Sequence, residues 1–344
     1  MNKRHLKAVF QSFMLRAHAA NKTTTAVVNG GDNVKFSDAI RMVYSKEIEF
    51  RALPNMRFFQ FATVKTELGT EPGLTISMLT YDNLALGGAL TEMTAMTTQA
   101  LSGSTKQITV QEYGNAVGVS ELLVQSSFDD IMASATTLLG RDYAMVVDCE
   151  LRDAALGNTN YIVYAADGGT PVSSRANLTK NCTLKVSTIK DAIEILATNN
   201  APKYNNTNWI CFVHPHQSRG LRDDSAWINA SNYGAPDQLF TGEIGRIDDT
   251  RFIETTLMCN GACASTDPAY NADLVHGATG APADVDVYQA VIFGDAYLGI
   301  AFSLPVELRD NGVEDFGRRR SLAWYAIFGV GRLHNDYGVV IETA

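Results

Sequence analysis

The chain has 344 residues, of which 46% are hydrophobic and 19% are charged, and its formal net charge is −9. This composition supplies a large apolar core and excludes global disorder, while the acidic balance excludes a general nucleic-acid-binding protein, which would be basic. No apolar run approaches the roughly 18 residues that span a bilayer, so no membrane protein is expected. The five scattered cysteines favour a reducing compartment over a disulfide scaffold.

The N-terminal segment is basic, because no acidic residue precedes Asp32. Three interpretations fit it: a transit peptide, a disordered arm, or an arm that lies against a polyanion or a neighbouring subunit. The rest of the chain favours an arm that lies against a polyanion or a neighbouring subunit. The basic side chains assigned to this arm are Lys3, Arg4, Lys7 and Arg16. Helical spacing follows over residues 38–53 and ends before Pro54.

Apolar and polar residues alternate at 61–68, 74–79 and 108–112, which predicts strands. Residues 81–104 lie between the second and third of these strands and carry only two charges. A lone two-stranded ribbon is marginally stable, and long loops without structure are usually functional. We therefore expect a partner surface, most simply on a second copy of the chain, with an active-site lid as the alternative. The apolar side chains expected there are Leu84, Leu86, Leu90, Met93, Met96 and Leu101.

Residues 127–156 are predicted to form one long helix. Ser127 followed by Asp130 is a capping pattern, and Gly157 supplies a residue that tolerates a left-handed stop. At about 1.5 Å per residue the helix would be roughly 45 Å long. Its predicted apolar face comprises Phe128, Ile131, Met132, Ala135, Leu138, Leu139, Val146 and Val147.

Short helices and strands alternate after this helix, which predicts a second α/β unit over residues 186–295. The tail is strand-like again, and its strands are expected to return to the long helix, so that the first domain is discontinuous. The elements predicted in this half are helices at 187–198 and 218–230 and strands at 209–213, 242–254, 285–293, 298–302, 322–330 and 339–341.

No catalytic motif is present, since the sequence has no P-loop, GxGxxG or GxSxG. His214 and His216 could serve a metal-dependent hydrolase together with a carboxylate, but Pro215 between them indicates a turn into a helix. Cys259 and Cys263 lack the second pair that a structural metal site needs. We therefore predict no catalytic residue, no metal and no cofactor.

Three consecutive arginines, Arg318, Arg319 and Arg320, follow Glu314 and Asp315. They could form a phosphate-binding patch, but beside apolar strands they are more often cross-strand or intersubunit ion pairs. We favour ion pairing and include them among the predicted intersubunit contacts.

The order of these parts resembles that of tailed-phage major capsid proteins with the Johnson fold of the Hong Kong 97 type. The amino-acid sequence is similar to that of the subfamily carried by the podovirus N-four and its relatives. The similarity runs from about residue 36 to the last residue. The stretches that carry it are TYDNLALGGALTE, KQITVQEYGNAVGVSELLVQSSFDD, WICFVHPHQSRGLRDDSAWI, GEIGRIDDTRFIET and RRRSLAWYAIFGVGRL.

The resemblance implies an α+β fold divided into five parts. These are an N-terminal arm at 1–35, a helix and linker at 36–60, an extended loop at 61–112, a discontinuous peripheral domain at 113–185 and 296–344 with its spine helix at 127–156, and an axial domain at 186–295.

The function that the resemblance implies is self-assembly, as hexamers and pentamers, into the icosahedral head around double-stranded phage DNA. Assembly would take place in the bacterial cytoplasm, with a separate scaffolding protein, a portal and a decoration protein as partners. The arm would face the lumen and contact DNA by charge. Residues 81–104 contain no lysine, so the isopeptide crosslink of some such coats is not expected. The alternatives are an encapsulin-type compartment with the same fold and a secreted adhesin, which would need a signal sequence.

Overall fold

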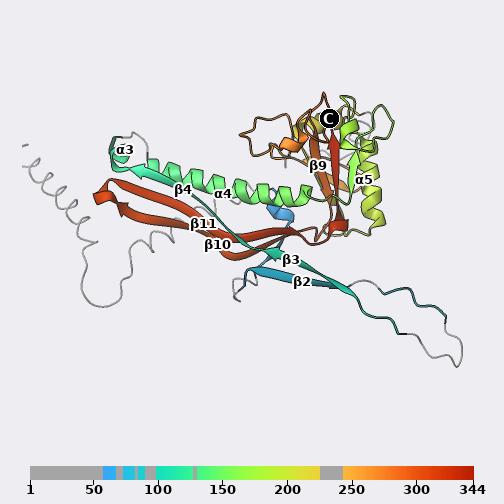
Figure 1. Cartoon of the computed structure of the whole chain (residues 1–344), viewed down its shortest axis with the longest axis horizontal. Helices are drawn as coiled ribbons and strands as arrows, with labels where there is room; N and C mark the ends of the chain where they lie inside the picture. Colours follow the sequence, from blue (N-terminus) through green and yellow to red (C-terminus); the bar gives the residue numbers. More distant parts are fainter. Residues whose placement is uncertain (1–56, 67–72, 82–83, 90–97, 127–129, 225–242) are drawn as a thin grey trace, which may run out of the picture. The chain divides into compact units, whose positions relative to one another are not determined.

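The computed structural model describes residues 57–66, 73–81, 84–89, 98–126, 130–224 and 243–344 (Figure 1). The predicted basic arm and the predicted helix at 38–53 lie outside these ranges. The described residues belong to one unit, Arg41–Ala344. Two larger sheets, one long helix and one two-stranded ribbon organise this unit.

A four-stranded sheet forms one half of the fold, with the strand order β1-β10-β11-β4. β1 is parallel to β10, whereas β10, β11 and β4 are antiparallel to one another. The bounds of the strands are β1 Thr63–Lys65, β4 Gln111–Ser120, β10 Leu298–Glu314 and β11 Arg319–Arg332.

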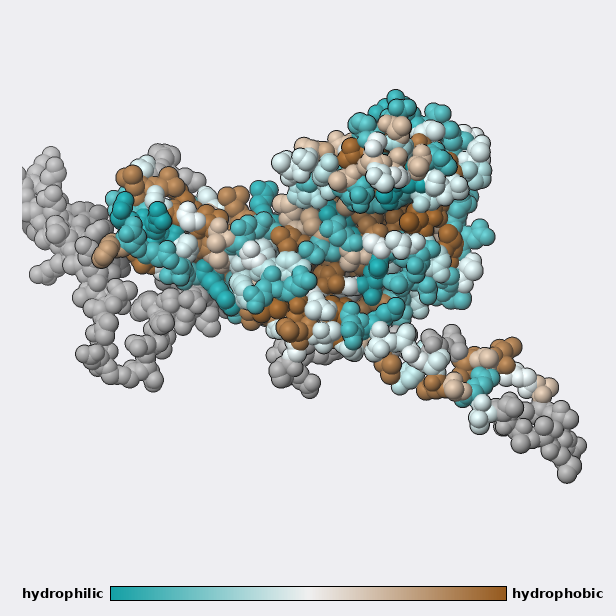
Figure 2. All heavy atoms as spheres, viewed as in Figure 1, coloured by the Kyte–Doolittle hydropathy of each residue, from teal (hydrophilic) through white to brown (hydrophobic). Residues whose placement is uncertain are grey.

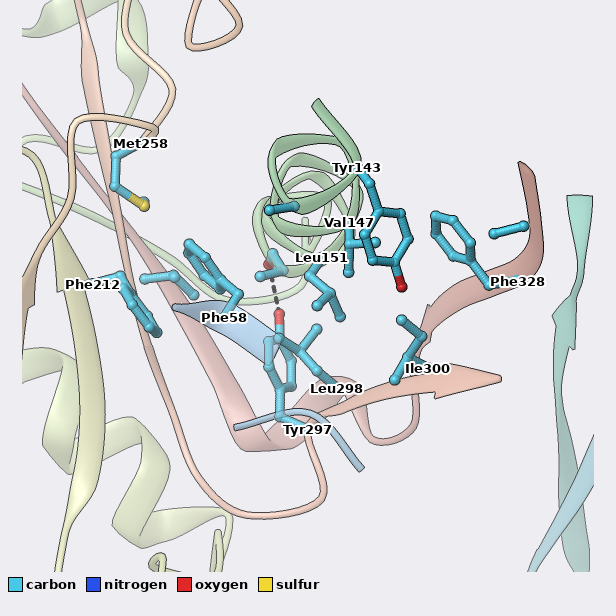
Figure 3. Packing of buried hydrophobic residues seen from close by; sticks show 14 of the residues in the cluster. Phe58, Tyr143, Val147, Leu151, Phe212, Met258, Tyr297, Leu298, Ile300 and Phe328 are labelled. Atoms are coloured by element: carbon cyan, nitrogen blue, oxygen red, sulfur yellow. Dashed lines mark hydrogen bonds between the residues drawn. The ribbon is translucent and has the colours of Figure 1, made fainter. Parts of the chain in front are cut away.

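The long helix α4, Ile131–Leu156, packs on this sheet through residues that recur every four positions (Figure 1). Positions four apart share one face of a helix, so this repeat forms a continuous apolar stripe. Figure 3 shows its side chains meeting Ile300 and Phe328 from the sheet, and the hydroxyl of Tyr297 donates to the Ala155 carbonyl at 2.7 Å. The stripe comprises Ala135, Leu139, Tyr143, Val147, Leu151 and Ala155.

The predicted last residue of this helix, Leu156, is confirmed, whereas its predicted start and the conformation of its stop need correction. The helix begins at Ile131, and its N-cap is Asp130, whose carboxylate accepts from the amides of Met132 and Ala133 at 3.1 and 3.2 Å. Gly157 ends the helix with a φ of −67°, so the predicted left-handed stop is wrong. Leu138 was predicted on the apolar face but is exposed, because the buried stripe follows four-residue steps from Ala135.

A six-stranded sheet forms the other half, with the strand order β5-β12-β9-β6-β8-β7. The β6 segment Trp209–Val213 is buried throughout, as expected for a strand covered on both faces. Ile210 and Phe212 pack in the cluster around α4, whereas Cys211 and Val213 pack in the cluster around α5. The bounds are β5 Ile162–Tyr164, β6 Trp209–Val213, β7 Glu243–Ile247, β8 Thr250–Glu254, β9 Tyr288–Phe293 and β12 Gly338–Thr343.

Strand β12 differs from the prediction for the tail. A strand does include 339–341, but it pairs with β5 and β9 in the six-stranded sheet instead of returning to the sheet of β10 and β11. Val340 packs toward α4, while Val339 and Ile341 pack toward α5, so β12 needs apolar neighbours on both faces. The segment predicted as a strand at 61–68 is likewise β1, which pairs with β10.

Shorter elements complete the chain. The helix predicted at 187–198 is present as α5, whereas the bounds predicted for the next helix, 218–230, are wrong: α6 runs from Pro215 to Arg222, and residues 225–230 lie outside the described ranges. Among the described residues, no helix is long and apolar enough to cross a membrane. The remaining elements are the helices α3 Glu121–Ser126, α5 Val186–Thr198 and α6 Pro215–Arg222, the 3-10 turns η2 Phe58–Phe61, η4 Arg175–Asn177, η6 Ala272–Leu274, η7 Asp315–Gly317 and η8 Asn335–Tyr337, and the ribbon strands β2 Thr75–Tyr81 and β3 Gly103–Thr109.

Candidate assembly surface

The ribbon pairs β2 with β3 in an antiparallel register that runs from Thr75 opposite Thr109 to Tyr81 opposite Gly103. Only its base is buried. Ile76 and Ile108, which face each other across the two strands, pack with Ala301 and Leu333. The ribbon predicted from the alternating pattern is therefore present and is anchored on the four-stranded sheet at one end.

Glycines of β11 form the seat under this base. A Cβ on Gly329 would lie 2.3 Å from the Thr109 carbonyl oxygen, and a Cβ on Gly331 would lie 3.0 Å from Cγ1 of Ile108. The first distance is far below any ordinary contact with a backbone atom, so only glycine fits at that position. The ribbon base thus rests directly on the backbone of β11. We call Gly329 and Gly331 the glycine seat.

The far end of the ribbon exposes apolar side chains. We call residues 84–89 and 98–102 the ribbon tip. Leu86 is 99% exposed, and Leu84 and Leu101 are also exposed. Figure 2 shows brown, hydrophobic residues along this ribbon. Leu90, Met93 and Met96, predicted with them, lie outside the described residues. Exposed apolar clusters of this kind mark interaction sites.

The ribbon strands add two exposed side chains that the prediction did not include. Leu79 and Tyr81 lie on the face opposite Ile76, because alternate residues of a strand point to opposite faces. The alternation in the sequence could have identified them, since Ile76 and Met78 already occupy the buried face. That face of the ribbon therefore exposes two apolar side chains near its far end, among mostly polar neighbours.

The three predicted arginines lie where β10 turns into β11. Arg320 pairs with the buried carboxylate of Asp310 on the neighbouring strand, with Oδ2 at 2.5 Å from Nη2 and 3.2 Å from Nε. This confirms a cross-strand ion pair. Nη1 of Arg318 lies 3.5 Å from Oδ2 of Asp315, so these two residues form an ion pair at the surface. Arg319 is exposed.

A second group of exposed apolar side chains surrounds these arginines, and no pattern in the sequence predicted it. Phe316 in the turn is 106% exposed, and Val313 and Leu122 are also exposed. Helix α3 is held beside the turn by the amide of Glu121, which donates to the Arg318 carbonyl at 2.9 Å. We call residues 120–126 and 313–319 the sheet tip.

The two histidines considered for a metal site are structural. His214 caps α6, its Nδ1 accepting from the His216 amide at 3.2 Å, and Pro215 is the first helical residue, as predicted. The His216 ring stacks on Tyr288 with centroids 4.3 Å apart. Burial and the neighbouring His216 lower the pKa of His214. Over the part of the chain that the structure describes, no three His, Cys, Asp or Glu side chains converge on a metal position.

The cysteines are free thiols. Burial raises the pKa of Cys259 to about 12, so its thiol stays protonated at neutral pH and is a poor nucleophile. Cys211 is fully buried in the core, as its place in an apolar strand predicted.

Comparison with known proteins gives a family and a fold. The family model described as "Phage capsid protein" matches residues 103–341. No curated protein sequence matches the chain.

Solved structures with similar folds are capsid structures of tailed phages. The structure titled "Cyanophage Pam1 capsid asymmetric unit" has a TM-score of 0.65 at 13% identity, covering 94% of this chain and 97% of that one. The head of Helicobacter pylori bacteriophage KHP40 gives 0.62 at 14% identity, with coverages of 94% and 96%. The capsid of Ralstonia phage GP4 gives 0.58 at 18% identity, with coverages of 82% and 87%. The α+β fold expected from the sequence, that of the Hong Kong 97 type, is confirmed.

Proposed function

This chain belongs to the phage capsid protein family, and on that premise we propose how its surface builds the shell. It is a structural protein of the virion capsid and not an enzyme, and the shell is made of many copies of it. Our proposal is that the copies join as hexamers and pentamers into the icosahedral head that encloses double-stranded DNA.

The exposed ribbon tip is the observation that supports this proposal most directly. Leu84, Leu86 and Leu101 are exposed on a segment whose described residues are anchored in a buried cluster at the base of the ribbon. Burying apolar area stabilises an interface by about 25 cal/mol per Å² before the costs of association are subtracted. We propose that the ribbon tip packs on an adjacent copy, and that Leu90, Met93 and Met96 extend the same contact.

Repetition explains how such a modest contact suffices. In a closed symmetric array each copy gives one ribbon tip and receives another, so a weak contact is multiplied around the shell. The proposed domain division follows the same plan. Residues 113–185 and 296–344 would form the peripheral domain, 186–295 the axial domain and 61–112 the extended loop, although β5 and β12 hydrogen-bond within the sheet of the axial segment.

The finer assignments are also proposals. We assign the chain to the subfamily of the podovirus N-four, on the five stretches quoted above. A separate scaffolding protein, a portal and a decoration protein are its proposed partners in the host cytoplasm. The arm residues Lys3, Arg4, Lys7 and Arg16 would face the lumen, where cations near packaged DNA release counterions and gain affinity that falls with salt.

Electron microscopy and sedimentation of the purified full-length chain test the proposal. We expect closed particles from the unmodified chain and a large loss of particles for Leu86→Asp, which places a charge in the contact. Ser187→Asp, which adds the same charge at an exposed position of α5, should assemble normally.

A chain that stays a stable monomer under all assembly conditions, alone and with the proteins encoded beside it, would contradict the proposal. Particles filled with a cargo enzyme instead of DNA would favour the encapsulin-type compartment. Equal assembly by Leu86→Asp and Ser187→Asp would remove the ribbon tip from the interface.

A further inference from the structure

We propose that Asn311 is a self-modification site, at which the amide nitrogen of Gly312 attacks the Asn311 side chain, with Asp310 as the base, and the asparagine becomes aspartate or isoaspartate. The inference goes beyond the proposed function. It concerns the folded single chain, so it holds whether or not copies assemble.

The sequence offers this chemistry at Asn-Gly pairs. Glycine has no side chain to hinder its amide nitrogen, so the five-membered succinimide ring closes more readily before glycine than before other residues. The chain has three such pairs, at Asn29, Asn260 and Asn311. The first lies outside the described residues, whereas the structure describes the other two, which differ in their surroundings.

The pair at Asn260 is held against the reaction. Asn260 is buried, and its Oδ1 accepts from the amides of Ala262 and Cys263 at 3.1 and 3.0 Å. The amide of Gly261, which would have to attack, donates to the Val287 carbonyl at 3.1 Å. Ring closure there would break these hydrogen bonds inside a packed loop, so this pair should stay intact in the folded chain.

The pair at Asn311 lies in an open and irregular part of β10. The register of β10 against β11 shifts between Asp310 and Val313, so Asn311 and Gly312 form a bulge that leaves the regular ladder. Asn311 is exposed to water. Gly312 has a φ of 78°, and open space surrounds the position where its Cβ would be. The backbone can therefore move here without a collision.

A carboxylate is already placed on the proton that the reaction must remove. Oδ1 of the buried Asp310 accepts from the Gly312 amide at 2.8 Å. Its other oxygen, Oδ2, is held by Arg320, which fixes the orientation of the carboxylate. A base within hydrogen-bond distance of the proton that it abstracts meets the geometric condition for general base catalysis. The carboxamide is held as well, because Nδ2 of Asn311 contacts Oε1 of Glu314.

The reaction balances with water as the only co-reactant. The proton of the Gly312 amide passes to Asp310 as the amide nitrogen forms a bond to Cγ of Asn311. The bond between Cγ and Nδ2 then breaks, and the nitrogen takes up that proton and leaves as ammonia. Water opens the succinimide at either of its two carbonyls, which gives aspartate or isoaspartate. No oxidant or reductant is needed.

The product changes the end of the β10–β11 pair in one direction only. A carboxylate at position 311 would face the carboxylate of Glu314 in place of an amide donor, and like charges at this distance repel. Isoaspartate would also insert an extra backbone carbon into β10. Either product should loosen the pairing of Val313 with Arg320 and of Glu314 with Arg319, which directly follows the bulge.

Time-resolved peptide mapping of the purified full-length chain tests the inference. The chain is kept folded at neutral pH in water enriched in heavy oxygen, and a parallel sample is unfolded in urea. Mass spectrometry measures the conversion of Asn260 and Asn311, and the uptake of heavy oxygen identifies sites that converted during the incubation. We expect Asn311 to convert several-fold faster than Asn260 in the folded chain and both to convert at similar rates in urea. Equal rates in the folded chain, or an Asn311 rate that folding reduces as strongly as that of Asn260, would overturn the inference.

Variants separate the base from the accessibility of the site. Asp310→Asn should slow the conversion of Asn311 several-fold in the folded chain and leave its rate in urea unchanged. A folded Asp310→Asn chain that converts as fast as the unmodified chain would refute the role of Asp310. If this variant does not fold, the comparison of folded and unfolded rates in the unmodified chain still decides. Asn311→Gln is the matched control, because it should abolish conversion at 311 and leave Asn260 unaffected.

The variant Asn311→Asp imitates one product and tests its effect on the sheet. We expect faster hydrogen exchange at the amides of residues 313, 314, 319 and 320, with unchanged exchange in β6 as the internal reference. Identical exchange in Asn311→Asp and in the unmodified chain would contradict the predicted loosening of the pair.

Discussion

The ring of Phe58 stacks on the ring of Phe212, with centroids 3.9 Å apart and planes inclined by 18°. Phe58 belongs to the turn before β1, and Phe212 belongs to β6 of the six-stranded sheet. Phe58 is completely buried, in the same cluster as α4. This one contact therefore ties the segment that leads toward the ribbon to the sheet of the other half of the fold.

Replacing Phe58 by alanine should be costly for the unassembled chain. Removal of a fully buried phenylalanine typically lowers the free energy of unfolding by about 3–5 kcal/mol, through lost burial and the cavity left behind. Phe59→Ala is the matched control, because Phe59 is only half-buried and meets Phe302 edge-on at 6.3 Å. Urea unfolding of both variants measures the difference. Similar decreases in the free energy of unfolding for the two variants would contradict a larger contribution from the stacked ring of Phe58.

The carboxylate of Asp148 gives the fold a measurable pH dependence. Its Oδ1 accepts from the amides of Phe58 and Arg57 at 2.8 and 3.1 Å, while Oδ2 is buried without a hydrogen bond. Burial outweighs the amide bonds and raises the pKa of Asp148 to about 6. Between about pH 4 and pH 6, the Asp148 carboxyl of the folded state therefore holds a proton that the unfolded state has released.

The sign follows from that difference. The stabilisation linked to Asp148 is fully present below about pH 4, the usual pKa range of aspartate, and is lost as the pH rises through about 6. Relative to Asp148→Asn, the unmodified chain should gain on the order of 2–3 kcal/mol between pH 7 and pH 4. Unfolding free energies measured across this range provide the test, with the exposed Asp191→Asn as control. Parallel pH profiles for all three chains would contradict the prediction.

A buried ion pair joins the six-stranded sheet to the loop before α5. In the completely buried carboxylate of Glu342, Oε2 accepts from Nε of Arg175 at 2.8 Å, while Oε1 accepts from Nε2 of Gln289 at 2.9 Å and from Nη2 of Arg175. Removing one partner leaves an uncompensated buried charge, so Arg175→Met should lower the unfolding free energy by about 3–5 kcal/mol.

The double variant Arg175→Met with Glu342→Met should cost clearly less than the sum of the single variants, because neither charge is left alone. A double-mutant cycle by chemical denaturation measures the coupling, which for contacting residues is typically about 0.5–3 kcal/mol. Strict additivity would show that the pair is energetically independent.

Gly329→Ala tests the glycine seat. The added methyl would collide with the backbone of Thr109, which cannot rotate away, so the ribbon base must shift. Overpacking of this kind costs about 1–3 kcal/mol. Gly118→Ala is the control, since open space surrounds that position on β4. Thermal unfolding and hydrogen exchange at the amides of β2 and β3 report the effect. Unchanged exchange at the ribbon base in Gly329→Ala would contradict a seat that needs glycine.

The pattern of apolar and polar residues along the chain predicted those elements whose own sequence shows a single clear periodicity or an apolar run. The apolar run Trp209–Val213 is β6 with the predicted bounds, and the amphipathic spacing after residue 186 is α5. The ribbon followed from alternation, and the exposure of the described part of its tip followed from an apolar segment between two paired strands that is too long and too isolated to bury itself. These predictions depend on neighbours in the sequence, which is why they succeeded.

Predictions that depend on distant pairing were less complete. The predicted strand at 298–302 covers only the first part of β10, whereas pairing with β11 continues to Glu314 with shifts in register. β12 was assigned to the wrong sheet because its apolar run does not say which strands flank it. Phe316 gave no signal, since nothing local shows that Asp315 and Phe316 both take positive φ values.

The glycine seat also determines where each subunit can reach. The seven residues of β2 extend about 23 Å from a base held by a few side chains, at roughly 3.3 Å per residue. A tilt of about 10° at that base would carry the end of the strands sideways by roughly 4 Å, about the diameter of a methyl group. The two glycines of β11 thus fix the direction of a long projection. We expect a substitution at either glycine to change the curvature of an assembled lattice, although neither residue lies at the ribbon tip.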